Sequence, residues 1–409
     1  MKLAAWISAG TGLAALAGVA LAQQQAGEGT AVYWMTADTT SGMGAMMGGG
    51  GRPSLGSVLG AMGGRGNRDG YAHMLTLQLG ANRHASGEPA AEHLPPPGLQ
   101  AGASLPLVTP QQAAATRDAQ TGFPPNMERP RGRILIYWGC GEHARPGQPV
   151  VVDFATLTAG RVPPAFANAA MRVMSPPSAA RFATYGEWPN QRSRGAVPAA
   201  GSLVGDHVVR GNYSPEIRFT LAPGQDFLAP VRLVSNAAAP SGAVPVAWQP
   251  VGGSRAWFVT AMGAAGNGDM VMWTSSESQT APVMDYMPQD ELARLVQQRV
   301  LLPAAADRCT VPAEVARAGQ GSMLTVTAFG GEANFSSPVR PARAAASWRP
   351  DWTVKLRVKS SYLGLLGMTM DEMMGRGGEG AQPQPGDPNQ PKKKKKSLFE
   401  KGLGGLIPH

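Results

Sequence analysis

The chain has 409 residues, of which 43% are hydrophobic and 15% are charged, and its formal net charge is +9. This balance excludes a highly charged disordered protein and leaves enough apolar side chains for a packed core. The 53 glycines and 36 prolines predict many turns and few long helices. Residues 381–409 carry six lysines against two acidic residues, a net +4, so much of the positive charge lies in a tail. A basic nucleic-acid-binding face is therefore not expected.

The first 22 residues have the layout of a secretory signal peptide. Lys2 gives a short positive start, residues 3–21 are almost wholly apolar or small, and residues 20–22 form a small-x-small cleavage site. We therefore expect removal of residues 1–22 and an exported protein, in the periplasm or outside the cell. A retained membrane anchor is the alternative.

Residues 23–225 alternate between strand patterns and irregular stretches. Runs of β-branched and aromatic residues predict several strands. They cover residues 30–35, 71–79, 133–138, 150–154, 207–210 and 217–221. The Gly- and Met-rich residues 41–68 and the Pro- and Ala-rich residues 83–130 have too little bulky apolar surface to offset chain entropy. These two stretches are expected to be long mobile loops.

Between residues 229 and 341 the strand and turn signals are the most orderly. A strand ending in Trp248 precedes a Pro-Val-Gly-Gly turn and an aromatic-rich strand at residues 256–261. Residues 321–328 then give a Leu-Thr-Val-Thr-Ala strand, followed by Ser-Ser-Pro338. This string resembles a fibronectin type III or related immunoglobulin-like sandwich. The resemblance implies a binding or spacing module, without catalytic residues.

One segment departs from that resemblance. Residues 289–301 place Leu292, Leu295, Val296 and Val300 at helical spacing. This periodicity predicts one inserted amphipathic helix packed on the sandwich.

The last predicted strand, residues 352–359, alternates between apolar and basic side chains. Its basic face, with Lys355, Arg357 and Lys359, is expected to face solvent.

The sequence thus predicts a mainly β fold with two β-sandwich-like domains. The first is an N-terminal β-rich domain at residues 23–225, and the second is a fibronectin type III-like domain with the final strand at residues 226–365. Residues 366–409 form a disordered tail with a polybasic end. A single interleaved β unit is the alternative to two domains.

The two cysteines, Cys140 and Cys309, are candidates for one disulfide in an oxidising compartment. Two buried free thiols are the alternative. Cys140 also begins a Cys-x-Glu-His sequence with Glu142 and His143, which could form a nucleophile pair or two zinc ligands. A turn with exposed polar neighbours is the favoured interpretation, because a zinc site needs more ligands.

Two Met-x-x-Met-Met-Gly stretches could bind Cu(I), since thioether sulfur suits that ion. Their methionines are Met43, Met46, Met47, Met370, Met373 and Met374. Compositional bias is the favoured explanation, because neither stretch has a companion histidine or a repeated Met spacing.

The C-terminal tail combines a polybasic run with apolar side chains, a pattern that can bind an anionic membrane surface. The residues concerned are Lys392, Lys393, Lys394, Lys395, Lys396, Leu398 and Phe399. A solvated, disordered tail is the favoured interpretation, because the glycines that follow weaken any helix.

We expect an exported cell-envelope binding or structural protein, non-enzymatic and without a cofactor. Its expected partners are an envelope component or another protein, and not nucleic acid. Tyr185, Trp188 and the pair Tyr137–Trp138 could line a sugar-binding face, but core packing is the favoured role for them.

Two other functions stay open. An envelope carbohydrate hydrolase would need carboxylates such as Asp153, Glu187, Asp206 and Glu216 to converge in a cleft. A Met-rich copper-binding protein is the third possibility.

Overall fold

Strands dominate the structure, and the fold is mainly β. The computed structural model describes residues 30–47, 70–110, 132–153, 171–191, 193, 197–280, 285–341, 343, 345 and 348–368. The strands are β1 (Ala31–Gly42), β2 (Tyr71–Ala81), β3 (Ala91–Leu94), β4 (Leu105–Leu107), β5 (Arg133–Trp138), β6 (Val150–Asp153), β7 (Thr184–Trp188), β8 (Gly205–Gly211), β9 (Ile217–Leu221), β10 (Leu233–Asn236), β11 (Val244–Trp248), β12 (Ala256–Ala264), β13 (Met270–Thr274), β14 (Leu302–Pro303), β15 (Arg308–Val311), β16 (Gln320–Ser337) and β17 (Trp352–Leu365). The α-helices are α2 (Met43–Met47), α5 (Gln289–Gln297) and α6 (Ala313–Ala318), and short 3-10 helices span Pro97–Leu99 and Gly266–Gly268.

Ten strands form one large sheet, in the order β6-β5-β13-β12-β16-β17-β1-β2-β7, with β14 paired to β12. Most neighbours are antiparallel, but β1 pairs in parallel with β17 over all 12 of its residues, and β5 runs parallel to β13. Side chains alternate between the two faces of a strand. Along β1, Tyr33 and Met35 therefore enter one core, whereas Val32 and Trp34 enter another on the opposite face.

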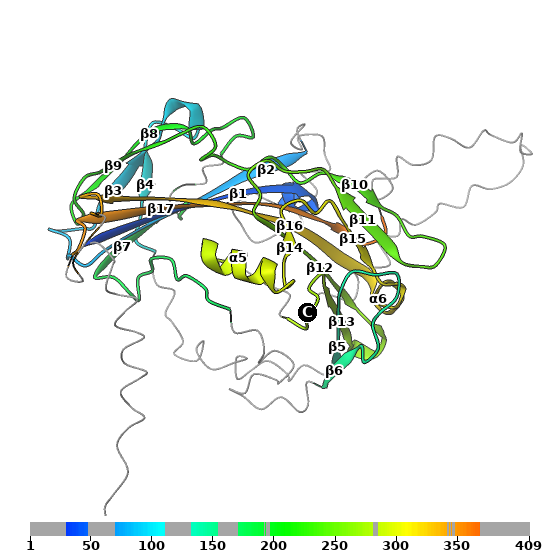
Figure 1. Ribbon diagram of the computed structural model, residues 1–409. Coiled ribbons are helices and arrows are strands. Elements are labelled where there is room, and N and C mark those ends of the chain that lie inside the picture. The colour runs from blue at the N-terminus through cyan, green and yellow to red at the C-terminus, as the bar shows by residue number, and fades with distance from the viewer. Residues whose placement is uncertain are drawn as a thin grey trace, which may run out of the picture. The chain divides into compact units, whose positions relative to one another are not determined.

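Strands from the second half of the chain form a sandwich. The three-stranded sheet β10-β11-β15 packs against the part of the large sheet made of β13, β12, β16 and β17 (Figure 1). The rings of Trp248 and Trp257 meet in its core with centroids 5.2 Å apart. Each indole also donates a hydrogen bond to a backbone carbonyl, of Ala306 and Ala304 respectively, so both polar N–H groups are satisfied. This arrangement is compatible with an immunoglobulin- or fibronectin type III-like sandwich.

A second small sheet, β4-β3-β8-β9, covers another part of the same face of the large sheet. The ring of Phe219 in β9 lies 5.4 Å from that of Phe335 in β16 and 6.3 Å from that of Tyr33 in β1. Towards the other end of β17, Asn236 of β10 donates a hydrogen bond to the carbonyl of Leu365. The two small sheets therefore lie near opposite ends of β17 (Figure 1).

The expected boundary at residues 225 and 226 does not separate two sheets. Strands β1, β2 and β7 extend the large sheet beyond β17, and β5 and β6 extend it beyond β13. Strands of the N-terminal half thus pair with β17 and β13, the two outer strands of the sandwich part of this sheet. Without that pairing, both strands would be sheet edges with unpaired backbone groups. All described residues belong to one unit, Met1–Thr369. In the described residues the two β regions share one large sheet, an arrangement that corresponds to the single interleaved unit considered from the sequence.

The opposite face of the large sheet is covered in part by α5, which confirms the amphipathic helix predicted at residues 289–301. Leu292 and Leu295 of α5 pack with Phe258 of β12 in a separate apolar cluster. The helix ends earlier than predicted, at Gln297, and Arg299 has a φ of 57° that no α-helix continues through.

Two stretches expected to be irregular contain regular structure. Within residues 41–68, β1 continues to Gly42 and α2 follows at once, and residues 48–68 lie outside the described residues. Within residues 83–130, β3 and β4 join the four-stranded sheet. Their sequences, AEHL and LPL, have weak strand propensity, and pairing with the distant β8 makes β3 a strand.

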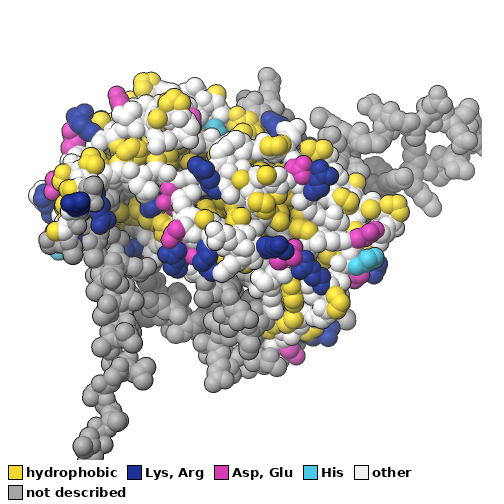
Figure 2. Space-filling model, in the orientation of Figure 1, with side chains coloured by type: hydrophobic (Ala, Val, Ile, Leu, Met, Phe, Trp, Pro, Cys, Tyr) yellow, Lys and Arg dark blue, Asp and Glu magenta, His cyan; other side chains and the backbone are white. Residues whose placement is uncertain are grey.

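Acidic and basic side chains lie next to one another on the face drawn in Figure 2, with apolar side chains between them. Ion pairs join neighbouring strands in the described residues, for example Arg210 of β8 with Glu92 of β3 at 2.7 Å. None of the described helices is long and apolar enough to cross a membrane.

Candidate functional site

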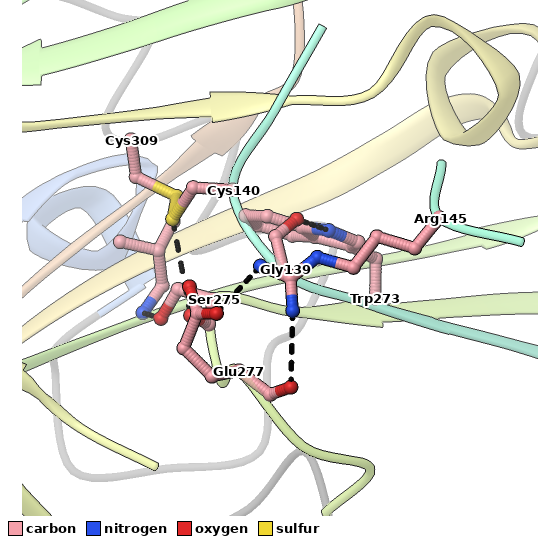
Figure 3. The surroundings of a disulfide bond; sticks show 8 residues. Gly139, Cys140, Arg145, Trp273, Ser275, Glu277 and Cys309 are labelled. Carbon is pink, nitrogen blue, oxygen red and sulfur yellow. Dashed lines mark hydrogen bonds and ion pairs between the residues drawn. A yellow bond between two sulfur atoms is a disulfide. The ribbon is translucent and has the colours of Figure 1, made fainter. Parts of the chain in front are cut away.

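A disulfide joins Cys140, which follows β5, to Cys309 on β15 (Figure 3). It therefore connects the end of β5, the second strand of the large sheet, to the three-stranded sheet. Backbone hydrogen bonds run alongside it: the Gly139 amide donates to Thr274, and the Gly141 amide donates to Thr310, both at 2.9 Å. The loop after β5 is thus fixed to both layers of the sandwich.

Polar contacts complete the surroundings of this disulfide (Figure 3). The Trp273 indole donates a 3.0 Å hydrogen bond to the Gly139 carbonyl, and Arg145 forms a 2.6 Å ion pair with Glu277. Because Cys140 is disulfide-bonded, it cannot act as a thiolate nucleophile or zinc ligand with His143. These contacts indicate a structural role for the disulfide loop.

Four charged side chains lie together on the α5 face of the large sheet, and we call them the ionic cluster: Asp38 of β1, Asp285, and Arg357 and Lys359 of β17. Asp285 contacts Arg357 Nη1 at 2.6 Å and Lys359 Nζ at 2.7 Å. Asp38 lies 3.4 Å from Lys359 Nζ and 4.0 Å from Arg357 Nη2. Arg357 and Lys359 therefore each lie within 4.0 Å of both carboxylates.

The ionic cluster corrects the prediction that the basic face of residues 352–359 is solvent-exposed. Arg357 is only 5% exposed, and its guanidinium lies over the Tyr286 ring at 4.3 Å. The Asp285–Tyr286 segment is also joined to a further segment, since the Tyr286 carbonyl accepts a 2.7 Å hydrogen bond from the Met174 amide. The alternation of apolar and basic residues in β17 predicts two faces of the strand. It does not predict that a segment distant in the sequence covers the basic face.

Electrostatics in the ionic cluster differ between the two carboxyls. Burial raises the pKa of Asp38 above its ordinary value, and the attraction of Lys359 and Arg357 only partly offsets it. Burial would also raise the pKa of Asp285, but Lys359 and Arg357 together hold that pKa below its usual range. Asp38 Oδ1 and Arg357 Nε and Nη2 are buried and have no hydrogen-bond partner in the described part of the chain.

A second buried polar group connects β1 to the four-stranded sheet through three side chains. Tyr33 Oη lies 2.6 Å from His93 Nδ1, His93 Nε2 lies 3.0 Å from His207 Nδ1, and His207 Nε2 lies 2.7 Å from the Leu203 carbonyl. A carbonyl only accepts, so His207 Nε2 carries a proton and its Nδ1 accepts from His93. His93 Nδ1 then accepts from Tyr33. All four ring nitrogens therefore have a hydrogen-bond partner when both histidines are neutral.

Acidification is therefore expected to destabilise the fold. Burial lowers the pKa of His93 and His207 below the ordinary value near 6.5, so the unfolded chain takes up protons that the folded chain excludes. Their contribution is fully present above pH 6.5 and is lost as the pH falls, by up to roughly 2 kcal/mol for each histidine between pH 6.5 and 5. Urea unfolding at pH 7.5 and pH 5 measures the difference.

Two glutamine variants, H93Q and H207Q, and an exposed control, H84N, assign this pH dependence. Each glutamine variant is expected to show a smaller stability difference between the two pH values than the wild type, because one titrating ring is gone. The control is expected to match the wild type. Equal pH dependence in all four proteins would contradict the assignment.

A groove of about 330 Å³ lies at the β7 edge of the large sheet. It is lined by Val108, Thr109, Pro110, Glu187, Asn190 and Gln191. Glu187 belongs to β7, between the buried Tyr185 and Trp188, which are 4% and 1% exposed. Those two aromatics lie in the core, as favoured from the sequence.

The four carboxylates considered for a hydrolase are not gathered in this groove. Glu187 lines it, whereas Asp153 ends β6, Asp206 accepts a hydrogen bond from Thr220, and Glu216 forms a 2.6 Å ion pair with Arg218.

The copper and membrane candidates fall largely outside the described residues. Met43, Met46 and Met47 belong to α2, whereas Met370, Met373 and Met374 and the tail residues 392–399 are not among the described residues. Within the described residues, no group of three or more His, Cys, Asp or Glu side chains could hold a metal ion.

Sequence reasoning missed both the ionic cluster and the buried histidines. Asp38 and Asp285 have no spacing that relates them, because they are 247 residues apart (285 − 38) and meet only through the sheet. The one available signal was the basic alternation of residues 352–359. His93 lies in a Pro- and Ala-rich stretch that was expected to be irregular, so no buried role was predicted for it.

Comparison with known proteins gave no match: no family model, no curated protein and no solved structure resembles this chain significantly.

Proposed function

We propose that this chain is an exported binding or structural protein of the cell envelope, without enzymatic activity. The observation that carries the proposal is the disulfide between Cys140 and Cys309. Structural disulfides form and persist in oxidising compartments such as the periplasm and the extracellular space. The signal-peptide layout of residues 1–22 supports the same location.

The sandwich of β10 to β17 supports the binding or structural part of the proposal. We assign it to the fibronectin type III-like class on the resemblance of residues 229–341 and on its two packed sheets. Modules of this shape more often bind or space other molecules than catalyse reactions, although a fold does not dictate a function.

Cell fractionation tests the location and the role of the tail. If the lysine run binds anionic lipid, full-length protein is recovered in the membrane fraction and a variant that lacks residues 392–409 is soluble in the periplasm. If the tail is only solvated, both are soluble in the periplasm. A matched variant with residues 392–396 changed to glutamine separates charge from the apolar residues. Full-length protein in the cytoplasm would contradict export, and identical fractionation of the three proteins would contradict a tail anchor.

An envelope carbohydrate hydrolase is a second candidate, and one observation favours it. Asp38 and Asp285 contact the same Lys359 ammonium, and their pKa values shift in opposite directions, as for paired acid and base groups. Both carboxylates are already engaged by cations, which favours the non-enzymatic proposal. Release of reducing sugar from isolated cell-wall carbohydrate by the wild type, and its loss in D38N, would reverse that preference.

A further inference from the structure

The β7 groove contains one charged side chain, that of Glu187, among its six lining residues. Glu187 forms no ion pair with any cation in the described ranges of the chain. One of its oxygens, Oε2, accepts a 2.6 Å hydrogen bond from the Tyr185 hydroxyl. The Glu187 carboxylate thus lines a hollow of the surface without a counter-ion among the described residues.

A second layer of hydrogen bonds fixes the Glu187 carboxylate. The Gln78 side-chain amide donates to the Tyr185 hydroxyl at 3.0 Å and also to the Pro177 carbonyl at 3.2 Å. Tyr185 can therefore use its proton only on Glu187. Supporting bonds of this kind hold a binding group in a defined position before its ligand arrives.

The backbone around the groove is equally well fixed. Val108 and Glu187 exchange both backbone hydrogen bonds at 3.0 Å. The Asn190 side-chain amide donates to the carbonyls of Pro106 and Glu187 at 2.7 and 2.9 Å. The Thr109 hydroxyl donates to the Tyr185 carbonyl at 2.7 Å, so its oxygen is left as an acceptor. The groove thus presents a carboxylate and a hydroxyl oxygen, both of which accept hydrogen bonds.

We propose that this groove binds a small polar ligand through a primary ammonium group, held by the Glu187 carboxylate and the Thr109 hydroxyl oxygen. An ammonium carries three hydrogen-bond donors and a positive charge, and no described residue supplies such a charge to Glu187. A volume of about 330 Å³ suits a ligand of monosaccharide size. The inference rests on the proposed binding function and names the chemistry of its ligand.

Saturation-transfer NMR and calorimetry on the full mature chain test the proposal with three probes. Glucosamine carries the ammonium on a sugar, N-acetylglucosamine is the same sugar without the charge, and Nα-acetyl-lysine amide carries the ammonium on an alkyl chain. We expect binding of at least one ammonium probe, and binding of N-acetylglucosamine that is at least about tenfold weaker, since a charge-assisted hydrogen bond contributes about 1.5–3 kcal/mol. Which ammonium probe binds shows whether the source is an amino sugar or a lysine side chain.

Three variants locate the site. E187Q removes the charge and is expected to weaken ammonium binding about tenfold or more. Y185F removes the hydroxyl that positions Glu187, and it is expected to weaken ammonium binding less than E187Q does. The control E216Q changes an exposed carboxylate paired with Arg218 and is expected to bind like the wild type.

No binding of either ammonium probe, equal binding of N-acetylglucosamine, or unchanged binding in E187Q would overturn this inference. Fractionation is independent of these results, so an exported protein that fails to bind ammonium would refute the groove and leave the proposed function standing.

Discussion

Replacing Arg357 with methionine is expected to lower the free energy of unfolding by about 3–5 kcal/mol. The Arg357 guanidinium is buried, pairs with Asp285 at 2.6 Å and lies over the Tyr286 ring. Methionine keeps an unbranched apolar stem but lacks the guanidinium, so the change removes both the charge and the contact with the Tyr286 ring. Asp285 and Asp38 are then left in a partly buried site with Lys359 as their remaining cation. Urea denaturation at pH 7.5 measures the loss.

Two further variants separate the charge from packing. R218M removes an exposed arginine that pairs with Glu216, and it is expected to cost less than about 1 kcal/mol. The double variant R357M/D285N removes one charge of each sign and is expected to regain part of the stability that R357M loses, because less charge stays unpaired. An R357M protein as stable as the R218M protein would show that the ionic cluster does not hold the Asp285 segment on the sheet.

Removing the disulfide with the double variant C140A/C309A is expected to lower the free energy of unfolding by about 2–5 kcal/mol. The bond closes a loop across 169 residues, so it strongly restricts the unfolded chain. Alanine is chosen because Cys309 is 3% exposed, and serine would bury a hydroxyl there. Thermal or urea unfolding of the oxidised wild type and the variant gives the difference.

Reduction of the wild type provides the control for that comparison. In excess reductant, the wild type is expected to unfold at a denaturant midpoint close to that of the double variant. The midpoint of the double variant is expected to be the same with and without reductant. If the oxidised wild type and C140A/C309A unfold at the same denaturant concentration, the disulfide contributes no stability and the backbone bonds of residues 139–141 hold the loop alone.

Strand positions were largely predictable from the sequence, because apolar alternation and turn residues act locally. The strands predicted at residues 71–79, 133–138 and 256–261 lie within or coincide with β2, β5 and β12. The helix predicted at residues 289–301 is present as α5. Strand partners were not predictable in the same way. The parallel pairing of β1 with β17 joins segments more than 300 residues apart, and no local pattern encodes it.

The candidate sites were less predictable than the fold, for a physical reason. A strand pattern tells which residues share a face but not what covers that face. Arg357 is buried because the segment at Asp285 and Tyr286 lies against it. Glu187 was one of several carboxylates in the sequence, and its place in a groove depends on pairing with Val108 from another segment.

The most direct test of the proposed function is the intact mass of the protein recovered from the periplasm, with and without thiol alkylation. We predict a mass for a chain that begins at Gln23, two hydrogens lighter than the reduced form and unchanged by alkylating reagent unless a reductant is added first. A protein that retains residues 1–22, stays in the cytoplasm and takes up two alkyl groups without reduction would contradict export into an oxidising compartment.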